Sequence, residues 1–315
     1  MQIIRGLHNL RPDHRGCVAT IGNFDGVHRG HQSVIKKLLQ QARLHGLPAT
    51  VVVFEPQPAE YFRGDATPPR LTSLRDKCLL LAQYGVDRLV VLRFDAQLAA
   101  LTAAQFIEGV LVEGLGIRSL IIGDDFRFGC DRGGDYSTLK DFATRHGFSV
   151  DYTSSFLALD ERASSTRVRA ALQAGDFRAA TELLGHPFRI SGRIVHGNKN
   201  GRAMGFATAN LNLSRRRSPL HGIFAAWVHG VRPDPWPGVA YVGTRPIIDG
   251  VKWVLEVHLL DFDEDCYGRH ISVDFIEKIR GDLPFTTFEA LAAQIRIDCE
   301  QAHRILAGVN RRVAS

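Results

Sequence analysis

The feature that most limits how this chain can fold is an alternation of two periodicities over residues 17–150. Short β-branched runs alternate there with segments in which apolar residues recur every three or four positions. Strand and helix repeated in this way predict an α/β fold, a parallel sheet with helices on both faces. The expected strands are 18–21, 50–54, 88–92 and 119–122, and the expected helices are 31–45, 73–84 and 103–115.

The pattern changes after Pro187. Two further expected helices, 165–174 and 177–184, come first, and Gly185 and Pro187 act as stop signals. Strand-length runs separated by turn residues then predict a small antiparallel β-barrel or sandwich. Its expected strands are 188–195, 223–228, 239–242, 253–260 and 271–279, and a C-terminal amphipathic helix, 287–306, is expected to pack against it. We therefore predict two domains, residues 1–185 and 186–315.

Composition excludes several classes of protein. With 45% hydrophobic and 23% charged residues, the chain is typical of folded globular proteins and not of disordered ones. No apolar run approaches the roughly 18 residues that cross a bilayer. Residues 1–10 lack the layout of a secretory signal, so we expect a cytoplasmic protein that does not enter a membrane. The 5 cysteines are scattered without a C-x-x-C pair, which suggests neither a disulfide framework nor a zinc site.

The formal net charge of +6 fits either anionic small ligands or nucleic acid, and charge alone does not choose between them. The dense basic cluster at 215–217 lacks interleaved aromatic residues, so we expect a solvated loop and no nucleic-acid partner. A nucleic-acid-binding protein would instead bind with a steep salt dependence. The sequence leaves the oligomeric state open.

A glycine-containing segment, T-I-G-N-F-D-G-V-H-R-G-H at 20–31, follows the first expected strand and opens the first helix. Its glycines let the backbone approach a ligand, and a helix start offers N–H groups to an anion. His28 and His31 are three residues apart, which places both imidazoles on one face of a helical turn. Such donors suit the charge that builds on phosphorus during displacement. From H-x-x-H alone, a metal pair or two unrelated surface histidines remain alternatives.

The whole segment resembles the H-x-G-H signature of the nucleotidyltransferase superfamily. More narrowly, it resembles the G-N-F-D-G-V-H-x-G-H string of the bacterial bifunctional riboflavin kinase and FAD synthetase family. The resemblance implies a Rossmann-like domain that transfers the AMP part of ATP to the phosphate of FMN, giving FAD and pyrophosphate. It implies that His28 and His31 are catalytic. The implied nucleotide and phosphate contacts are Gly22, Asn23, Phe24, Asp25 and Gly26. Because H-x-G-H does not name the acceptor, another phosphorylated acceptor is an alternative.

Three further strings extend the resemblance. They are F-E-P-Q-P at 54–58, I-G-D-D-F-R-F-G at 122–129 and S-S-T-R-V-R at 164–169. The implied flavin contacts are Phe54, Pro56, Asp124, Asp125, Phe126 and Phe128, and the implied nucleotide contacts are Ser164, Ser165, Thr166 and Arg169. Hydroxyls at a helix start bind phosphate or cap amides, and an arginine adds a charge-assisted fork. A plain N-cap and an ordinary acidic turn with aromatic anchors are the alternatives.

The second half of the chain resembles riboflavin kinases. G-R-A-M-G-F-A-T-A-N at 201–210 matches G-R-x-x-G-x-P-T-A-N except for Ala207. The resemblance implies that Gly201 and Arg202 bind nucleotide and that Thr208 and Asn210 hold Mg²⁺, which prefers oxygen ligands. Glu256, in L-E-V-H-L-L-D-F, aligns with the family's proposed general base for the 5′-hydroxyl of riboflavin. A structural ion pair would also explain this carboxylate within an apolar strand.

Other departures lie in this half: Tyr241 stands where Asn is common, and Pro284 interrupts a usual acidic-basic run. We expect a bifunctional enzyme that converts riboflavin to FMN and FMN to FAD with ATP and Mg²⁺. The alternative is an FAD synthetase whose barrel only binds flavin or regulates.

Overall fold

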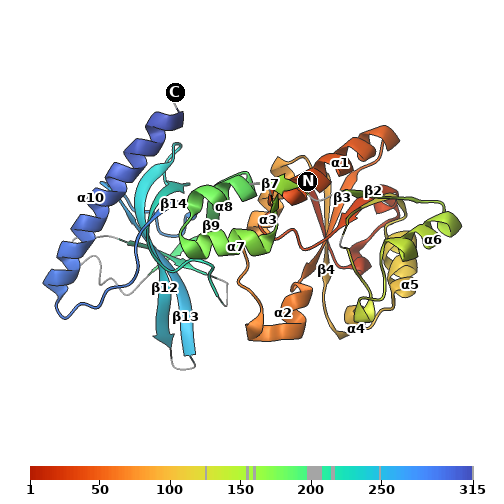
Figure 1. Ribbon diagram of the computed structural model, residues 1–315, viewed down its shortest axis with the longest axis horizontal. Helices are drawn as coiled ribbons and strands as arrows, with labels where there is room; N and C mark the ends of the chain where they lie inside the picture. Colours follow the sequence, from red (N-terminus) through yellow and green to blue (C-terminus); the bar gives the residue numbers. More distant parts are fainter. Residues whose placement is uncertain are drawn as a thin grey trace. The chain divides into compact units, whose positions relative to one another are not determined.

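The structure is a computed structural model that describes residues 1–124, 126–153, 156–158, 161–196, 208–213, 217–247 and 250–313 (Figure 1). The chain forms two compact units. The sheet unit comprises Met1–Thr67 and Lys77–Ser164, and the barrel unit comprises Pro68–Asp76 and Ser165–Ser315. The two expected architectures are confirmed, one in each unit.

The sheet unit is built on a parallel sheet with the strand order β1-β4-β3-β2-β5-β6. Every residue of β2 is buried, so both faces of the sheet are covered. From β2 the chain adds β3 and β4 on one side and β5 and β6 on the other. The loops after β2 and β5 therefore flank the switch point at which open sheets bind ligands. The strands are β1 (Gln2–Arg5), β2 (Cys17–Ile21), β3 (Ala49–Glu55), β4 (Arg88–Arg93), β5 (Ile117–Gly123) and β6 (Ser149–Thr153).

The longest helix of the sheet unit buries one face against this sheet. Helix α1 (Arg29–His45) packs on β2, β3, β5 and β6 and ends at Gly46, which has a left-handed backbone with φ 62°. The expected helix 103–115 is confirmed, but it is wound as α5 (Ala103–Gln105) followed by a π-helix (Phe106–Gly114). Other helices are α2 (Pro58–Arg63), α4 (Ala96–Ala99), α6 (Tyr136–His146) and α3 (Leu74–Gln83), of which the first three residues belong to the barrel unit.

The barrel unit contains a closed antiparallel barrel with the strand order β10-β13-β12-β11-β14-β9. Strand β9 pairs with both β10 and β14, which closes the barrel and excludes the sandwich alternative. Along the strands, side chains that point into the barrel alternate with side chains on its outer face, as in other small barrels. The strands are β9 (Phe188–Val195), β10 (Thr208–Asn212), β11 (Gly222–His229), β12 (Trp236–Ile247), β13 (Gly250–Leu259) and β14 (His270–Arg280).

Among the residues that the structure describes, α7, α8 and α10 accompany the barrel. Helices α7 (Ser165–Ala174) and α8 (Phe177–Leu184) pack on each other, and α8 contacts β9 and β14. The expected C-terminal helix is confirmed as α10 (Phe288–Val313), which contacts β11, β12 and β14. Its Ala302 and Leu306 join an apolar cluster with Ala225 and Val239. Helix α10 therefore packs on the outer face of the barrel, at the part of β12 that contains Val239.

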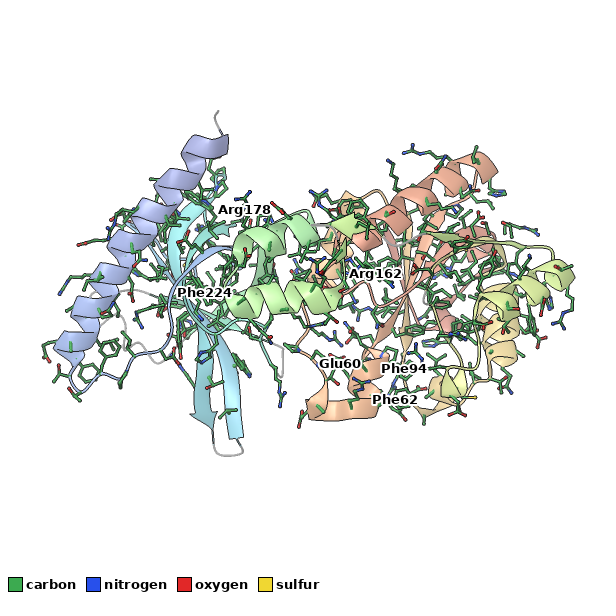
Figure 2. All side chains as sticks on the ribbon, viewed as in Figure 1. Glu60, Phe62, Phe94, Arg162, Arg178 and Phe224 are labelled. Atoms are coloured by element: carbon green, nitrogen blue, oxygen red, sulfur yellow. The ribbon has the colours of Figure 1, made fainter. Side chains whose placement is uncertain are left out.

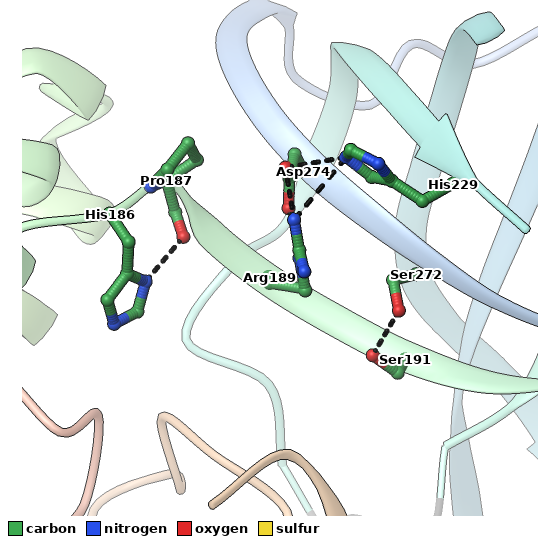
Figure 3. A network of polar contacts seen from close by, with 7 residues as sticks. All are labelled: His186, Pro187, Arg189, Ser191, His229, Ser272 and Asp274. Atoms are coloured by element: carbon green, nitrogen blue, oxygen red, sulfur yellow. Dashed lines mark hydrogen bonds and ion pairs between the residues drawn. The ribbon is translucent and has the colours of Figure 1, made fainter. Parts of the chain in front are cut away.

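The outer face of the barrel also carries a polar network shared by three strands (Figure 3). Asp274 on β14 accepts hydrogen bonds from Arg189 Nε at 2.5 Å and Nη2 at 2.7 Å. His229 Nε2 on β11 lies 2.9 Å from the Asp274 Oδ2 atom. Both carboxylate oxygens of this buried residue are thus bonded within the barrel, which indicates a structural role. Across the described ranges, no helix is long and apolar enough to cross a membrane.

Candidate active sites

The loop between β2 and α1 has an unusual backbone. Phe24 and Val27 have positive φ angles of 47° and 40°. For a β-branched residue such as Val27 this conformation is a genuine outlier that costs about 1–3 kcal/mol. Asp25 is 2% exposed within the same loop, whereas Asn23 is exposed. The fold therefore holds this loop in one strained shape at the sheet's switch point, as functional loops often are held.

The two histidines of the loop meet at the start of α1. His28 is the N-cap of the helix, and its side chain makes no capping bond. The rings of His28 and His31 are stacked with centroids 3.7 Å apart, so the expected shared face is confirmed. The ring of Phe24 lies 4.9 Å from that of His31. Phe24 is 2% exposed, so the His31 imidazole packs against a buried ring.

The environment keeps His31 neutral. Burial, and then the positive charges of His28 and Lys77, hold the pKa of His31 well below its usual value. Its Nδ1 atom is buried and has no hydrogen-bond partner within the described part of the chain. Lys77 is itself fully buried at 0% exposure. Sequence reasoning missed Lys77, since a lysine within a helical pattern predicts a solvated position.

The glycine between the histidines is required by close packing. A Cβ atom at Gly30 would lie 3.1 Å from the Ala163 carbonyl oxygen and 3.1 Å from the His28 ring. Such distances are tighter than ordinary van der Waals contact, so a side chain here would displace the histidine. This packing explains the glycine of the H-x-G-H string in physical terms.

The aromatic residues expected to bind flavin form a continuous chain of rings in the sheet unit. Phe126 stacks on Phe128 with centroids 5.4 Å apart, and Phe128 lies 5.7 Å from Phe106. Phe106 in turn lies 6.5 Å from Phe54. These ring contacts link the end of β3, which bears Phe54, to the loop after β5, which bears Phe126 and Phe128. Phe128 is only 8% exposed and serves the core, while Phe54 and Phe126 are partly buried.

The remaining expected flavin contacts lie beside these rings in sequence. Asp124 forms an ion pair with Arg162 at 3.3 Å between Nη2 and Oδ1. Pro56 follows β3 in the turn before α2 and is preceded by a cis peptide bond. Asp125 lies outside the described residues.

Sequence reasoning missed three aromatic residues beside this ring chain. Phe94, at the end of β4, lies 5.7 Å from Phe54, and Tyr61 and Phe62 of α2 lie within 5.6 Å of Phe94. Figure 2 shows Phe62 and Phe94 side by side. Phe62 is 67% exposed, so it offers an apolar ring to a ligand. The adjacent Tyr-Phe pair at 61–62 was the available sequence signal.

The hydroxyl-rich string at 164–169 opens α7. Ser164 ends the sheet unit, and Ser165, Thr166 and Arg169 belong to the barrel unit. The Arg169 Nε atom donates to the Pro69 carbonyl at 2.6 Å, so this arginine also fastens the segment Pro68–Asp76. Their expected contact with nucleotide stays a prediction.

The expected kinase residues converge on the outer face of the barrel. In the strand register Asn210 lies opposite Glu256, and Thr208 lies opposite His258. On the other side of β13, Tyr241 of β12 lies opposite Glu256. The Asn210 Nδ2 atom donates to the Thr208 carbonyl at 3.3 Å, and this bond leaves its side-chain oxygen for other contacts. Gly201, Arg202, Ala207 and the arginines at 215–216 lie outside the described residues.

Glu256 has a cationic partner that sequence reasoning did not select. Arg245 Nη2 on β12 donates to Glu256 Oε1, and the Glu256 side chain is only 18% exposed. The Tyr241 hydroxyl lies 2.0 Å from where a Cβ atom at Gly243 would stand, so its ring covers this glycine. Burial, and then the charges of Asp282 and Glu256, raise the pKa of Tyr241. The tyrosine is therefore a neutral hydrogen-bond donor beside the carboxylate.

Comparisons with known proteins agree with these two sites. The family model for FAD synthetase matches residues 10–167, and the model for riboflavin kinase matches residues 184–306. A bifunctional riboflavin kinase/FMN adenylyltransferase from Pseudomonas fluorescens is 48% identical over 308 residues, which cover 98% of each chain. This chain belongs to that family. The relative from Escherichia coli strain K12, with the same name, is 49% identical over 299 residues, covering 95% of this chain and 96% of its own.

A solved structure also resembles this member of the family over its length. It is titled a macrolide-efflux protein from Streptococcus pneumoniae, has 28% identity and a TM-score of 0.80, and covers 96% of this chain and 99% of its own. The family, the two-part fold and the bifunctional enzyme class expected from sequence are thereby confirmed. The roles of individual residues and the domain limits 1–185 and 186–315 remain predictions.

Proposed function

We propose that this enzyme phosphorylates riboflavin to FMN with its barrel unit and transfers AMP from ATP to FMN with its sheet unit, using riboflavin, FMN and ATP as substrates. The observation that carries the proposal is that each unit presents its own set of phosphate-directed groups. These groups are the stacked histidines at the start of α1 and the Asn210–Glu256 row on the barrel. The cytoplasmic location stays a prediction.

In the sheet unit, the proposed reaction needs no protein nucleophile. A phosphate oxygen of FMN forms a bond to the α-phosphorus of ATP, and the bond to the bridging oxygen breaks to release pyrophosphate. His28 and the neutral His31 can each donate a hydrogen bond to the charge that develops on the phosphate oxygens. The backbone of the β2–α1 loop and the start of α1 would hold the triphosphate, with Gly22, Asn23, Asp25 and Gly26 lining it.

For the flavin of FMN we propose the partly buried aromatic rings at the carboxyl ends of β3 and β5. Phe54 and Phe126 lie in one ring chain with Phe106, and Phe94 and Phe62 extend it to an exposed surface. Flat aromatic ligands stack favourably on such rings. The ion pair of Asp124 with Arg162 supports the loop that bears Phe126. The nucleotide contacts expected from sequence at Ser165, Thr166 and Arg169 stay predictions.

In the barrel unit, we propose Glu256 as the general base. It takes the proton from the 5′-hydroxyl of riboflavin, the oxygen forms a bond to the γ-phosphorus of ATP, and ADP leaves. An ionised glutamate suits this task because it only accepts hydrogen bonds. Its side chain is only 18% exposed, which favours a cationic partner such as Arg245.

Both reactions imply Mg²⁺, and the residues present fit it. Thr208 and Asn210 offer hydroxyl and amide oxygens next to Glu256, which are ligands that Mg²⁺ accepts. Within the described ranges there is no cluster of three or more His, Cys, Asp or Glu that could hold a metal. In phosphoryl-transfer enzymes, substrate phosphates commonly supply further oxygen ligands to Mg²⁺. When bound, the ion would neutralise charge on the phosphate oxygens.

A chromatographic time course with Mg²⁺ tests the proposal. Wild-type protein should convert riboflavin and ATP to FMN and then to FAD. His28→Ala should stop FAD formation from FMN and leave FMN formation intact, and Glu256→Gln should do the reverse. If FAD forms only from supplied FMN, the barrel is not a working kinase. If neither reaction yields FAD, the flavin assignment of the sheet unit is wrong.

A further inference from the structure

The contact between Arg245 and Glu256 engages only one of the two carboxylate oxygens. Arg245 Nη2 bonds to Oε1, and no hydrogen bond to Oε2 occurs within the described part of the chain. The two side chains are 38% and 18% exposed, so the pair is partly shielded from water. One oxygen is therefore anchored, and the other is left to accept a proton.

The neighbouring strands determine from which side Arg245 approaches Glu256. Arg245 reaches Glu256 from β12, whereas Asn210 lies opposite Glu256 on β10, the other neighbour of β13. Tyr241 covers Gly243, the residue between Tyr241 and Arg245 on the same face of β12. The cation is thus held on the side of Glu256 away from the proposed Mg²⁺ ligands. A flexible glutamate gains a fixed orientation from such a contact.

A purely structural ion pair in the same barrel looks different. Asp274 has both carboxylate oxygens bonded, to Arg189 and His229, and is 5% exposed (Figure 3). That arrangement leaves little capacity to accept another proton. The half-engaged carboxylate of Glu256 is what a base that must receive a hydroxyl proton requires.

We propose that Arg245 is a positioning residue of the kinase reaction, which holds Glu256 through Oε1 so that Oε2 takes the proton of the riboflavin 5′-hydroxyl. The inference rests on the proposed role of Glu256. In the step, the O–H bond of riboflavin breaks and its proton goes to Oε2. The oxygen bonds to the γ-phosphorus, and the bond from that phosphorus to the bridging oxygen breaks to release ADP.

A double-mutant cycle on the full-length protein tests this inference. The variants are Arg245→Met, Arg245→Lys, Glu256→Gln and the double variant Arg245→Met/Glu256→Gln, assayed for kcat and for KM of riboflavin at saturating ATP. Arg245→Met should lower kcat about tenfold or more, because a misplaced base loses reactive geometry, and change KM less than about threefold. Arg245→Lys should recover part of the loss. In the Glu256→Gln background, Arg245→Met should cost less than about twofold in kcat.

The control is Arg232→Met, which removes an ion pair with Glu264 elsewhere on the barrel and should leave kcat unchanged. The fluorescence of the three tryptophans, Trp227, Trp236 and Trp253, reports whether the barrel is folded. If Arg245→Met does not fold, the same cycle with Arg245→Lys decides. Equal losses in both backgrounds, or no loss in either, would overturn the inference. Full kinase activity of Glu256→Gln would instead overturn the proposed base, and the inference with it.

Discussion

At the scale of single residues, Gly30 shows how packing rather than helix propensity decides an identity. Alanine favours helices over glycine by about 1 kcal/mol, yet a Cβ at position 30 would press on the His28 ring at 3.1 Å. We expect Gly30→Ala to reduce FAD formation from FMN about tenfold or more and to leave FMN formation unchanged. Gly109→Ala is the matched control, since a Cβ there meets nothing within 4 Å. Wild-type rates in Gly30→Ala would contradict this explanation.

The lowered pKa of His31 predicts a pH dependence of stability. Burial, followed by the charges of His28 and Lys77, keeps this residue neutral in the folded protein, whereas the unfolded chain binds a proton near about pH 6.5. The free energy of unfolding should therefore fall as the pH drops below that value, by at most about 1.4 kcal/mol per pH unit from this residue. His31→Gln should lose less stability between about pH 7 and about pH 5.5.

Hydrogen exchange of peptides from the sheet unit measures this difference. His45→Gln, at an exposed position on the same helix, serves as the control and should keep the wild-type dependence. The same loss of protection in His31→Gln and in wild type would show that His31 does not contribute.

At the scale of elements, a buried carboxylate fastens α10 to the barrel in addition to the apolar contacts of the helix. Asp298 is 2% exposed and accepts hydrogen bonds from Arg280 of β14 at 2.7–3.1 Å and from Gln294 at 2.9 Å. Asp298→Ala leaves the Arg280 charge without its partner, so we expect a loss of about 3–5 kcal/mol. Urea unfolding followed by tryptophan fluorescence reports the barrel alone, because the three tryptophans are Trp227, Trp236 and Trp253. Arg304→Ala on the exposed side of α10 should change stability by less than about 0.5 kcal/mol, and equal effects of the two variants would contradict this account.

At the scale of the whole molecule, the central groups of each proposed site belong to a single unit. His28 and His31 belong to the sheet unit, and Asn210 and Glu256 belong to the barrel unit. A mixture of the His28→Ala and Glu256→Gln proteins should therefore convert riboflavin to FAD. FMN made by the first protein should accumulate in solution before the second consumes it, which gives a lag that shortens as the protein concentration rises. Absence of FAD in the mixture, with each protein active on its remaining reaction, would show that FMN must pass between sites of one molecule.

The amino-acid pattern was sufficient for several elements whose interactions are local, although it missed α2, α4 and α6. Four strands of the parallel sheet and the C-terminal helix follow from hydrophobic periodicity, and the stacking of His28 on His31 follows from a spacing of three at a helix start. The pattern missed β1 and β6 at the sheet edges. The first has four residues, and half-exposed edge strands lack the continuous apolar run of central ones.

Strand register decided what no local pattern could. Thr208, Asn210, Tyr241 and Glu256 come from three strands, and only the pairing of β10 and β12 with β13 brings them together. The ion pair of Arg245 with Glu256 likewise depends on the pairing of β12 with β13, because the two residues are not directly opposite each other and meet diagonally. The closure of the barrel rests on β9 pairing with both β10 and β14, a long-range choice that a sandwich of the same strands would not make. Side chains distant in sequence meet only when the hydrogen-bonded ladder aligns them, and that alignment is a property of the folded chain.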